Sequence, residues 1–125
     1  MCVTKLQPGF DKSINLVPVR GNFSRGILTS CYTECSSGQQ EIEKLYAEFY
    51  KNHPFTIISQ SNPDLKQVVN TNKCILYVER FDNKLYILSL IDNLIKGASG
   101  QAVQNMNLVF GLPEDAGLHL KSIGF

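Results

Sequence analysis

Two β-rich runs of equal length, separated by two residues, constrain the fold of this chain more than any other feature. Cys74 to Phe81 and Lys84 to Ile91 are rich in β-branched, aromatic and other apolar side chains, and Asp82-Asn83 between them is typical of a two-residue hairpin. The second run is apolar on both faces except at Ser89, which predicts a central strand covered on both sides. The chain must therefore build a sheet around this hairpin.

One helix is predicted upstream of the hairpin. Ser37 and Gln40 fit a capping box at its start, and His53-Pro54 marks its end because proline disfavours helix at the preceding residue. Between them an apolar stripe recurs at helical spacing, formed by Ile42, Leu45, Tyr46 and Phe49. We expect this stripe to face the sheet.

Shorter patterns complete the predicted architecture. Three further strands are expected, with Pro18 restricting the first to an edge or an end: Ile14 to Val19, Ile27 to Tyr32 and Phe55 to Ser59. A second helix is expected from Gln101 to Phe110, with Gly111 at the position after its C-cap and Pro113 preventing continuation. The order of elements predicts an α+β fold with a mixed, largely antiparallel sheet packed by helices.

Length and charge exclude several classes of protein. The chain has 125 residues, is 43% hydrophobic and has a formal net charge of +1, which is ordinary for one globular domain. The charge gives no reason to expect binding to nucleic acid or a membrane surface. Met1 to Phe10 contain no apolar run of signal-peptide length. A self-contained two-domain dehydrogenase or kinase would not fit in this length.

The cysteines and histidines do not predict a metal site. The four cysteines are Cys2, Cys31, Cys35 and Cys74, and the two histidines, His53 and His119, have no ligand partner at metal spacing. In a chain without a signal peptide, such cysteines are expected to be reduced and mostly buried. We therefore expect a cytoplasmic protein without zinc.

The segment Lys96-Gly97-Ala98-Ser99-Gly100-Gln101 is the most informative candidate site. Small residues let a ligand approach the backbone, and a helix N-terminus presents N–H groups and partial positive charge, to which Lys96 adds a full charge. The alternative is a tight strand-to-helix turn with Ser99 as N-cap. The segment is neither a Gly-x-x-x-x-Gly-Lys phosphate loop nor a Gly-x-Gly-x-x-Gly dinucleotide fingerprint.

Two other polar groups are candidates for ligand contacts. Arg20 and Arg25 bracket a glycine-bounded loop, and guanidinium groups suit bidentate capture of a carboxylate or phosphate; surface salt bridges are the alternative. Amide side chains also crowd the start of the second helix, where they bond either a ligand or partner, or water: Asn93, Gln101, Gln104, Asn105 and Asn107. No catalytic set accompanies them, since no cysteine has a histidine nearby in sequence or sits at a helix N-terminus.

The run from Ile91 to Asn107, Ile-Asp-Asn-Leu-Ile-Lys-Gly-Ala-Ser-Gly-Gln-Ala-Val-Gln-Asn-Met-Asn, resembles the C-terminal signature of the N-acetyl-gamma-glutamyl-phosphate reductases. These enzymes are the arginine-biosynthesis members of the semialdehyde dehydrogenase family. Shorter matches extend the resemblance over nearly the whole chain: Pro18, Arg25 to Leu28, Pro54-Phe55, Asn70 to Asn72, Phe110 to Glu114 and Gly117-Leu118.

The resemblance implies a two-domain enzyme whose N-terminal Rossmann domain binds NADP. A cysteine of that enzyme forms a thioester with the substrate, N-acetyl-glutamyl phosphate, a histidine acts as acid and base, and the C-terminal domain contacts substrate and forms the oligomer through its sheet. This chain, residues 1–125, is similar to the C-terminal domain alone, whose fold resembles that of glyceraldehyde-3-phosphate dehydrogenase-like enzymes. No catalytic residue is therefore carried over.

What the resemblance carries over is a set of binding residues. Arg20 and Arg25 become expected substrate-anion contacts, and the expected cofactor contacts are Asn93, Lys96, Gly97, Ala98, Ser99, Gly100 and Gln101. The chain departs from the family where Asn22-Phe23-Ser24-Arg25-Gly26 replaces Pro-Met-x-Arg-Gly and Val19 replaces a common histidine, which leaves acetyl and succinyl substrates open.

We expect a reductase chain that lacks its Rossmann domain, through deletion, truncation or a split gene, and that does not turn over alone. Two alternatives remain open at this stage. One is a non-catalytic homodimerising scaffold or regulatory module that retains the fold, and the other is the related aspartate-semialdehyde dehydrogenase.

Overall fold

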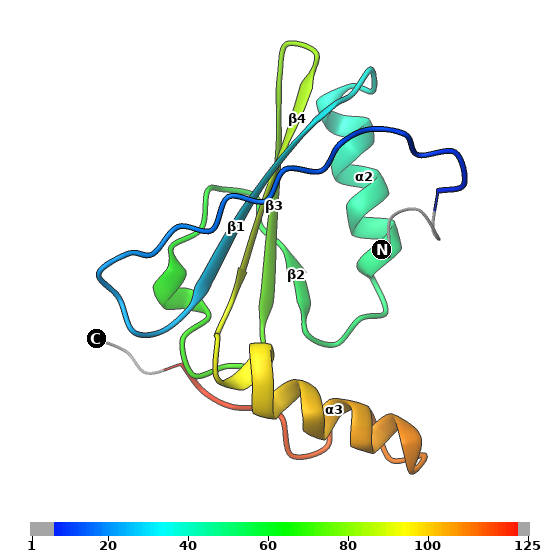
Figure 1. Cartoon of the computed structure of the whole chain (residues 1–125). Helices are drawn as coiled ribbons and strands as arrows, with labels where there is room; N and C mark the ends of the chain where they lie inside the picture. The colour runs from blue at the N-terminus through cyan, green and yellow to red at the C-terminus, as the bar shows by residue number, and fades with distance from the viewer. Residues whose placement is uncertain (1–6, 123–125) are drawn as a thin grey trace.

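A computed structural model describes residues 7–122 of the chain. The sheet has the order β1-β4-β3-β2, with β1 and β3 antiparallel to β4 and β2 parallel to β3 (Figure 1). The strands and helices are β1 (Ile27–Glu34), α2 (Gln39–Tyr50), β2 (Thr56–Ile58), β3 (Cys74–Phe81), β4 (Lys84–Ile91) and α3 (Gly100–Val109). A 3-10 turn (Leu65–Gln67) precedes β3, and a π-helical turn (Ile95–Ser99) precedes α3. The predicted α+β class with a mixed, largely antiparallel sheet is confirmed.

The predicted hairpin has the bounds expected from the sequence. β3 and β4 pair along their whole length, from Cys74 opposite Ile91 to Phe81 opposite Lys84. Asp82 adopts a positive φ of 51° at the turn, a conformation that aspartate and asparagine tolerate better than most residues. β4 lies between β1 and β3 and is the central strand, as predicted.

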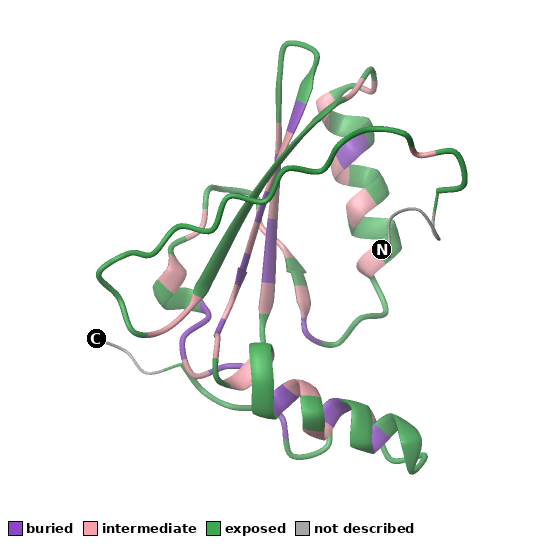
Figure 2. Ribbon diagram, in the orientation of Figure 1, coloured by how far each residue is buried: buried purple, intermediate pink, exposed green. Residues whose placement is uncertain are grey.

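The sheet is covered on both faces, by different segments. On one face Ile75, Leu88 and Leu90 form a core with Val68, which follows the 3-10 turn. On the other face Val78 and Leu85 form a second core with Ile42 of α2. Figure 2 shows buried residues in β3 and β4 and in both helices, whereas β1 is exposed along its length. The inner strands are therefore covered on both faces, and the edge strand β1 is not.

Helix α2 differs from its sequence prediction at the start and in the stripe. Its N-cap is Gly38 and has no side-chain capping bond, so the predicted capping box is wrong. Ile42 is buried, but Leu45 and Phe49 are 64% and 67% exposed. The apolar stripe therefore faces the sheet only in part.

The predicted strand from Ile14 to Val19 is wrong. These residues lie in an extended, exposed segment outside the sheet, because Pro18 cannot donate a ladder bond and no strand pairs with the segment within residues 7–122. The next predicted strand is confirmed and runs to Glu34. At the other end, Gly111 follows the C-cap of α3 with φ of 67°, which confirms its predicted position.

Cys31, Cys35 and Cys74 are free thiols, and Cys2 lies outside the described residues. Cys31 is exposed and the other two are half-buried, so the expectation of mostly buried thiols is wrong for Cys31. Between residues 7 and 122, no helix has the length and apolar character needed to cross a membrane.

Candidate functional site

The polar centre of the domain is Asp92, the first residue after β4. Its side chain is fully buried. Oδ1 accepts hydrogen bonds from the backbone N–H groups of Leu94 at 2.7 Å and Ile95 at 2.8 Å. Oδ2 accepts one from the backbone N–H of Asn70 at 2.7 Å and one from Nη2 of Arg25 at 2.7 Å. One carboxylate therefore joins an arginine loop, the loop before β3 and the start of a helix.

These contacts determine the charge state of Asp92. Burial by itself raises the pKa of the carboxyl, but backbone hydrogen bonds from Asn70, Ile95 and Leu94, together with Arg25, outweigh burial and lower the pKa below its ordinary value. Asp92 is therefore a carboxylate at neutral pH, and Arg25 is its counter-ion. Arg25 does form an ion pair, but with a fully buried carboxylate and not at the surface, where the alternative for the arginine loop expected it.

Asn93 bonds the backbone of the loop that carries Arg25. Its Oδ1 accepts from the backbone N–H of Gly26 at 2.9 Å, and its Nδ2 donates to the carbonyl of Ser24 at 3.3 Å. Gly26 has φ of 98°, and a Cβ there would lie 2.7 Å from the side chain of Leu65, so a glycine is required for two reasons. Asp92 thus bonds the side chain of Arg25, and Asn93 bonds the backbone of the residues before and after Arg25.

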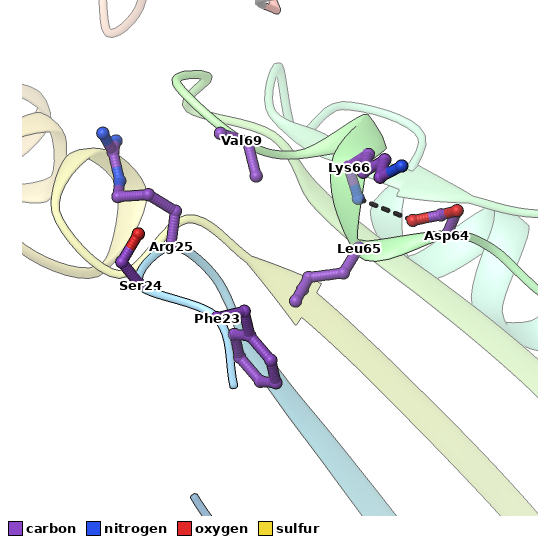
Figure 3. A pocket seen from close by; sticks show the side chains of 7 residues that line it. All are labelled: Phe23, Ser24, Arg25, Asp64, Leu65, Lys66 and Val69. Carbon is purple, nitrogen blue, oxygen red and sulfur yellow. Dashed lines mark hydrogen bonds between the residues drawn. The ribbon is translucent and has the colours of Figure 1, made fainter. Parts of the chain in front are cut away.

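A pocket of about 340 Å³ lies beside this loop (Figure 3). Phe23 and Leu65 approach each other across it, while the guanidinium of Arg25 points away from Phe23. Arg25 Nε is buried and has no hydrogen-bond partner among the described residues. The lining residues are Phe23, Ser24, Arg25, Asp64, Leu65, Lys66 and Val69. The pocket therefore combines apolar walls with two cationic residues, Arg25 and Lys66, and one acidic residue, Asp64.

Helix α3 begins at Gly100, within the segment from Gly97 to Gln101, and a π-helical turn from Ile95 to Ser99 leads into it. The chain already turns at Ile95, and the backbone N–H groups of Gly97 and Ser99 donate to the carbonyls of Asp92 and Leu94 at 2.7 and 3.0 Å. Ser99 occupies the N-cap position of α3, as the alternative interpretation expected, but its side chain makes no capping bond. Its hydroxyl donates back to the carbonyl of Leu94, and Asp92 accepts from the first N–H groups of the preceding turn. The segment therefore has no helix-terminal anion site.

Lys96 also has internal partners. Its ammonium donates to Oε1 of Gln104 at 2.5 Å and lies 5.4 Å from the centre of the Phe55 ring. Burial lowers the pKa of Lys96, and the nearby Cys74 and Glu114 partly offset this effect. Lys96 is thus directed towards the side of the domain formed by Phe55 and Gln104.

The amide cluster divides into two groups. Gln104 and Asn107 are buried: Gln104 donates to Glu114 at 2.5 Å, and Asn107 donates to the carbonyls of Glu114 and Ala116 at 3.2 and 3.0 Å. They hold the turn after α3 against the helix. Gln101 and Asn105 bond each other. The buried amides thus bond within the domain, which is neither of the two alternatives expected from the sequence.

Arg20 lies apart from this centre. It is exposed on the extended segment before the loop, and none of the ion pairs formed within residues 7–122 involves it. Of the two arginines expected to act together, the structure therefore brings only Arg25 to the polar centre.

The residues around Asn93 fit the amide part of a nicotinamide cofactor better than its phosphates. After its two bonds, Asn93 retains one amide hydrogen and one oxygen lone pair. Gly97, Ala98 and Ser99 are small and at least partly exposed, so a flat ring could approach them closely. Phosphates would find the N–H groups of Gly97 and Ser99 occupied.

The described residues offer no evident catalytic group. No cluster of three or more His, Cys, Asp or Glu side chains that could hold a metal occurs within them. His53 stacks against Phe49, and His119 contacts the carboxylate of Asp115 at 2.7 Å on the surface. The site can bind and orient, and its residues do not form a nucleophile with a base.

The mixed sheet packed by helices, with the polar centre of Asp92 directly after β4, defines an α+β domain. Comparison with protein families makes this specific. Residues 3–93 match the family described as semialdehyde dehydrogenase, dimerisation domain, and the chain belongs to this family. The resemblance found in the sequence is thereby confirmed.

Curated relatives are similar over almost the whole chain. The N-acetyl-gamma-glutamyl-phosphate reductase of Parabacteroides distasonis is 56% identical over 98% of this chain and 38% of its own length. Those of Azobacteroides pseudotrichonymphae and Christiangramia forsetii are 58% and 57% identical over 89% and 94% of this chain, and over 35% and 37% of their own lengths. The chain thus spans between 35% and 38% of the length of these relatives.

Proposed function

We propose that residues 1–125 are the C-terminal substrate-binding and dimerisation domain of an NADP-dependent N-acetyl-gamma-glutamyl-phosphate reductase. In the complete enzyme, the substrate acyl phosphate would be reduced to N-acetyl-glutamate 5-semialdehyde with release of phosphate. The observation that carries the proposal is the 56% identity to the Parabacteroides distasonis reductase across 98% of this chain. The enzyme acts in arginine biosynthesis, in the cytoplasm, as a homo-oligomer.

Arg25 is the residue proposed to bind the anionic part of the substrate. Asp92 accepts from Nη2 and Nε is buried, which leaves the hydrogens of Nη1 for a carboxylate or phosphate. The adjoining apolar wall of Phe23 and Leu65 suits the acyl group. Arg20, although it makes no contact with the Asp92 centre, stays a second predicted contact.

Asn93 is proposed to hold the carboxamide of the nicotinamide through its remaining hydrogen and lone pair. Gly97, Ala98 and Ser99 would border the ring, with Lys96, Gly100 and Gln101 supporting them from within the domain. When bound, the cofactor supplies hydride for the reduction. The residues of this chain bind and orient, so the chain alone is expected to be inactive.

The test is isothermal titration of NADP and N-acetylglutamate into the purified chain, alone and with the N-terminal part of the Parabacteroides distasonis reductase added. We expect saturable binding with the added part and none without it. Arg25→Lys should weaken N-acetylglutamate binding at least tenfold, because a lysine cannot reproduce the guanidinium fork. Arg80→Lys, at an exposed position on β3, is the matched control and should bind as the unmodified chain does.

Absence of binding in both mixtures would contradict the proposal. It would favour the alternative of a non-catalytic scaffold that retains the fold. Binding that is equal in the Arg25→Lys and unmodified chains would contradict the assigned role of Arg25 while leaving the reductase assignment in place.

A further inference from the structure

Helix α3 buries polar side chains and exposes apolar ones. Gln104 and Asn107 are buried and bond within the domain, to Glu114 and to carbonyls of the turn after the helix. Met106 and Val109 are 46% and 79% exposed. A surface helix normally has the opposite arrangement, with its apolar stripe towards the core. The exposed side of α3 therefore resembles a surface that is covered in the complete protein.

The exposed apolar side chains follow helical spacing. Ala102, Met106 and Val109 recur at i, i+4 and i+7 and are all exposed, so they lie along one side of the helix, which we call the outer face of α3. Phe110 and Leu112 are exposed apolar side chains directly after the helix. Helices that bind in the groove of a partner use apolar anchors at this spacing. The outer face thus has the pattern of a docking helix.

No charge interrupts this apolar surface in the sequence. The chain has no Asp, Glu, Lys or Arg between Lys96 and Glu114. The exposed face of a helix in water is usually polar or charged. Contiguous apolar surface without charges marks a site of protein interaction more often than a solvated surface.

The fold leaves the outer face uncovered. Figure 1 shows α2 alongside the strands, whereas α3 lies beyond the end of the sheet and extends away from it. On its inner side, α3 is held by Gln104, which accepts from Lys96 at 2.5 Å and donates to Glu114 at 2.5 Å. The helix is therefore fixed to the domain by polar contacts, and its apolar anchors are free for another surface.

We propose that the outer face of α3 docks in an apolar groove of the part of the reductase that this chain does not cover. The match with the Parabacteroides distasonis relative spans 98% of this chain, so it includes α3, but only 38% of the relative. The match with the dimerisation-domain family covers residues 3–93 and ends before α3. These two findings favour the remaining part of the same enzyme, and not a second copy of this domain, as the occupant.

The position of α3 gives this docking a role in the proposed reductase. The residues from Asn93 to Ser99, which are proposed to border the nicotinamide, lead directly into the helix. A cofactor held by the other part of the enzyme must be brought against these residues, and docking of the adjoining helix would fix their separation. The inference rests on the proposed function and names the surface through which the two parts meet.

The first test measures association of the chain with the N-terminal part of the Parabacteroides distasonis reductase by isothermal titration, without cofactor or substrate. We expect saturable association of one chain with one N-terminal part. Val109→Lys should weaken it at least tenfold, because docking would bury an ammonium group without a partner. Leu45→Lys, at an exposed apolar position of α2, is the matched control and should associate as the unmodified chain does. Circular dichroism checks that each protein is folded.

The second test does not require separate parts. In a chimera, this chain replaces the matching part of the Parabacteroides distasonis reductase. Hydrogen exchange of α3 should be at least tenfold slower in the chimera than in the isolated chain, because docking stabilises the helix. Val109→Lys in the chimera should restore the faster exchange. Exchange of β4, the central strand, is the internal reference and should be equal in all three proteins.

Unchanged affinity of the folded Val109→Lys variant would overturn the proposal, as would equal exchange of α3 in the chimera and in the isolated chain. A lower mass of Val109→Lys than of the unmodified chain alone, by sedimentation equilibrium, would also overturn it, because α3 would then contact a second copy. Association without binding of NADP or N-acetylglutamate would support the docking and contradict the proposed function, so the two can fail separately.

Discussion

Gly100, the first residue of α3, lies where the surrounding atoms leave no space for a side chain. A Cβ at Gly100 would lie 1.7 Å from Oδ1 of Asn72 and 2.8 Å from the carbonyl oxygen of Ile95. Asn72 cannot readily move aside, because it is buried and its Nδ2 donates to the carbonyl of Leu118 at 2.8 Å. We predict that Gly100→Ala lowers the free energy of unfolding by about 2–3 kcal/mol through overpacking, measured by urea denaturation.

Gly38 provides the matched control for this substitution. A Cβ there would meet nothing within 4 Å, and φ is −72°, which alanine adopts readily. Gly38→Ala should therefore lower the free energy of unfolding by no more than about 1 kcal/mol, because only the weaker preference of alanine for an N-cap opposes it. Equal stability of the Gly100→Ala and Gly38→Ala chains would refute the close approach of α3 to Asn72.

At the residue scale, the sequence indicates the segment that leads into α3 but not the residue that bonds its first N–H groups. The segment from Lys96 to Gln101 stands out by its glycines and Ser99, yet the group that accepts from the first N–H groups of the turn is Asp92. Aspartate is a common capping residue, so the signal was present in the sequence. What the sequence could not show is that Asn70 and Arg25, distant along the chain, bond the same carboxylate.

At the scale of elements, Gln39 links α2 to β3. Its amide bonds both a carbonyl and an N–H of β3, and its Nε2 also donates to Glu43 at 2.7 Å. We predict that Gln39→Glu lowers the free energy of unfolding by about 1–3 kcal/mol, because a carboxylate cannot donate and would face a carbonyl oxygen and Glu43. Gln40→Glu, at the exposed neighbouring position, should have little effect in the same urea titration. Hydrogen exchange of Arg80 N–H should accelerate only in Gln39→Glu.

Elements with strong local patterns were predictable, and those defined by distant partners were not. The hairpin of β3 and β4 has alternation, length and turn residues in agreement, and it was predicted with its observed bounds. Ile14 to Val19 has a strand-like composition, but a strand requires a partner that composition does not reveal. The Gln39 contact with β3 likewise spans 39 residues of sequence and had no local signal.

At the scale of the whole molecule, Asp92 connects segments that the sheet alone would leave separate. It joins the Arg25 loop, the Asn70 loop and the helical turn that leads into α3. Asn70 adopts a positive φ of 59° to make its bond, a conformation that asparagine tolerates. A single buried carboxylate thus couples the Arg25 loop to the stability of the domain.

This coupling predicts a specific dependence of stability on pH. The pKa of Asp92 is lower in the folded chain than its ordinary value of about 3.9, so the unfolded chain binds the proton more readily. The resulting stabilisation is fully present above the unfolded pKa and is lost as pH falls from about 4 through the folded pKa. Stability measured by urea denaturation should therefore fall steeply in this acidic range.

Asp92→Asn should remove that contribution. At neutral pH we expect a loss of about 3 kcal/mol in the free energy of unfolding, because Arg25 loses its partner and one backbone N–H group loses a charged acceptor. Below pH 4 the difference from the unmodified chain should shrink, since protonation removes the same charge from Asp92 itself. Asp11→Asn, at an exposed position, should reproduce the pH dependence of the unmodified chain. Parallel stability curves for Asp92→Asn and the unmodified chain between pH 2 and pH 5 would show that Asp92 does not carry the acid sensitivity.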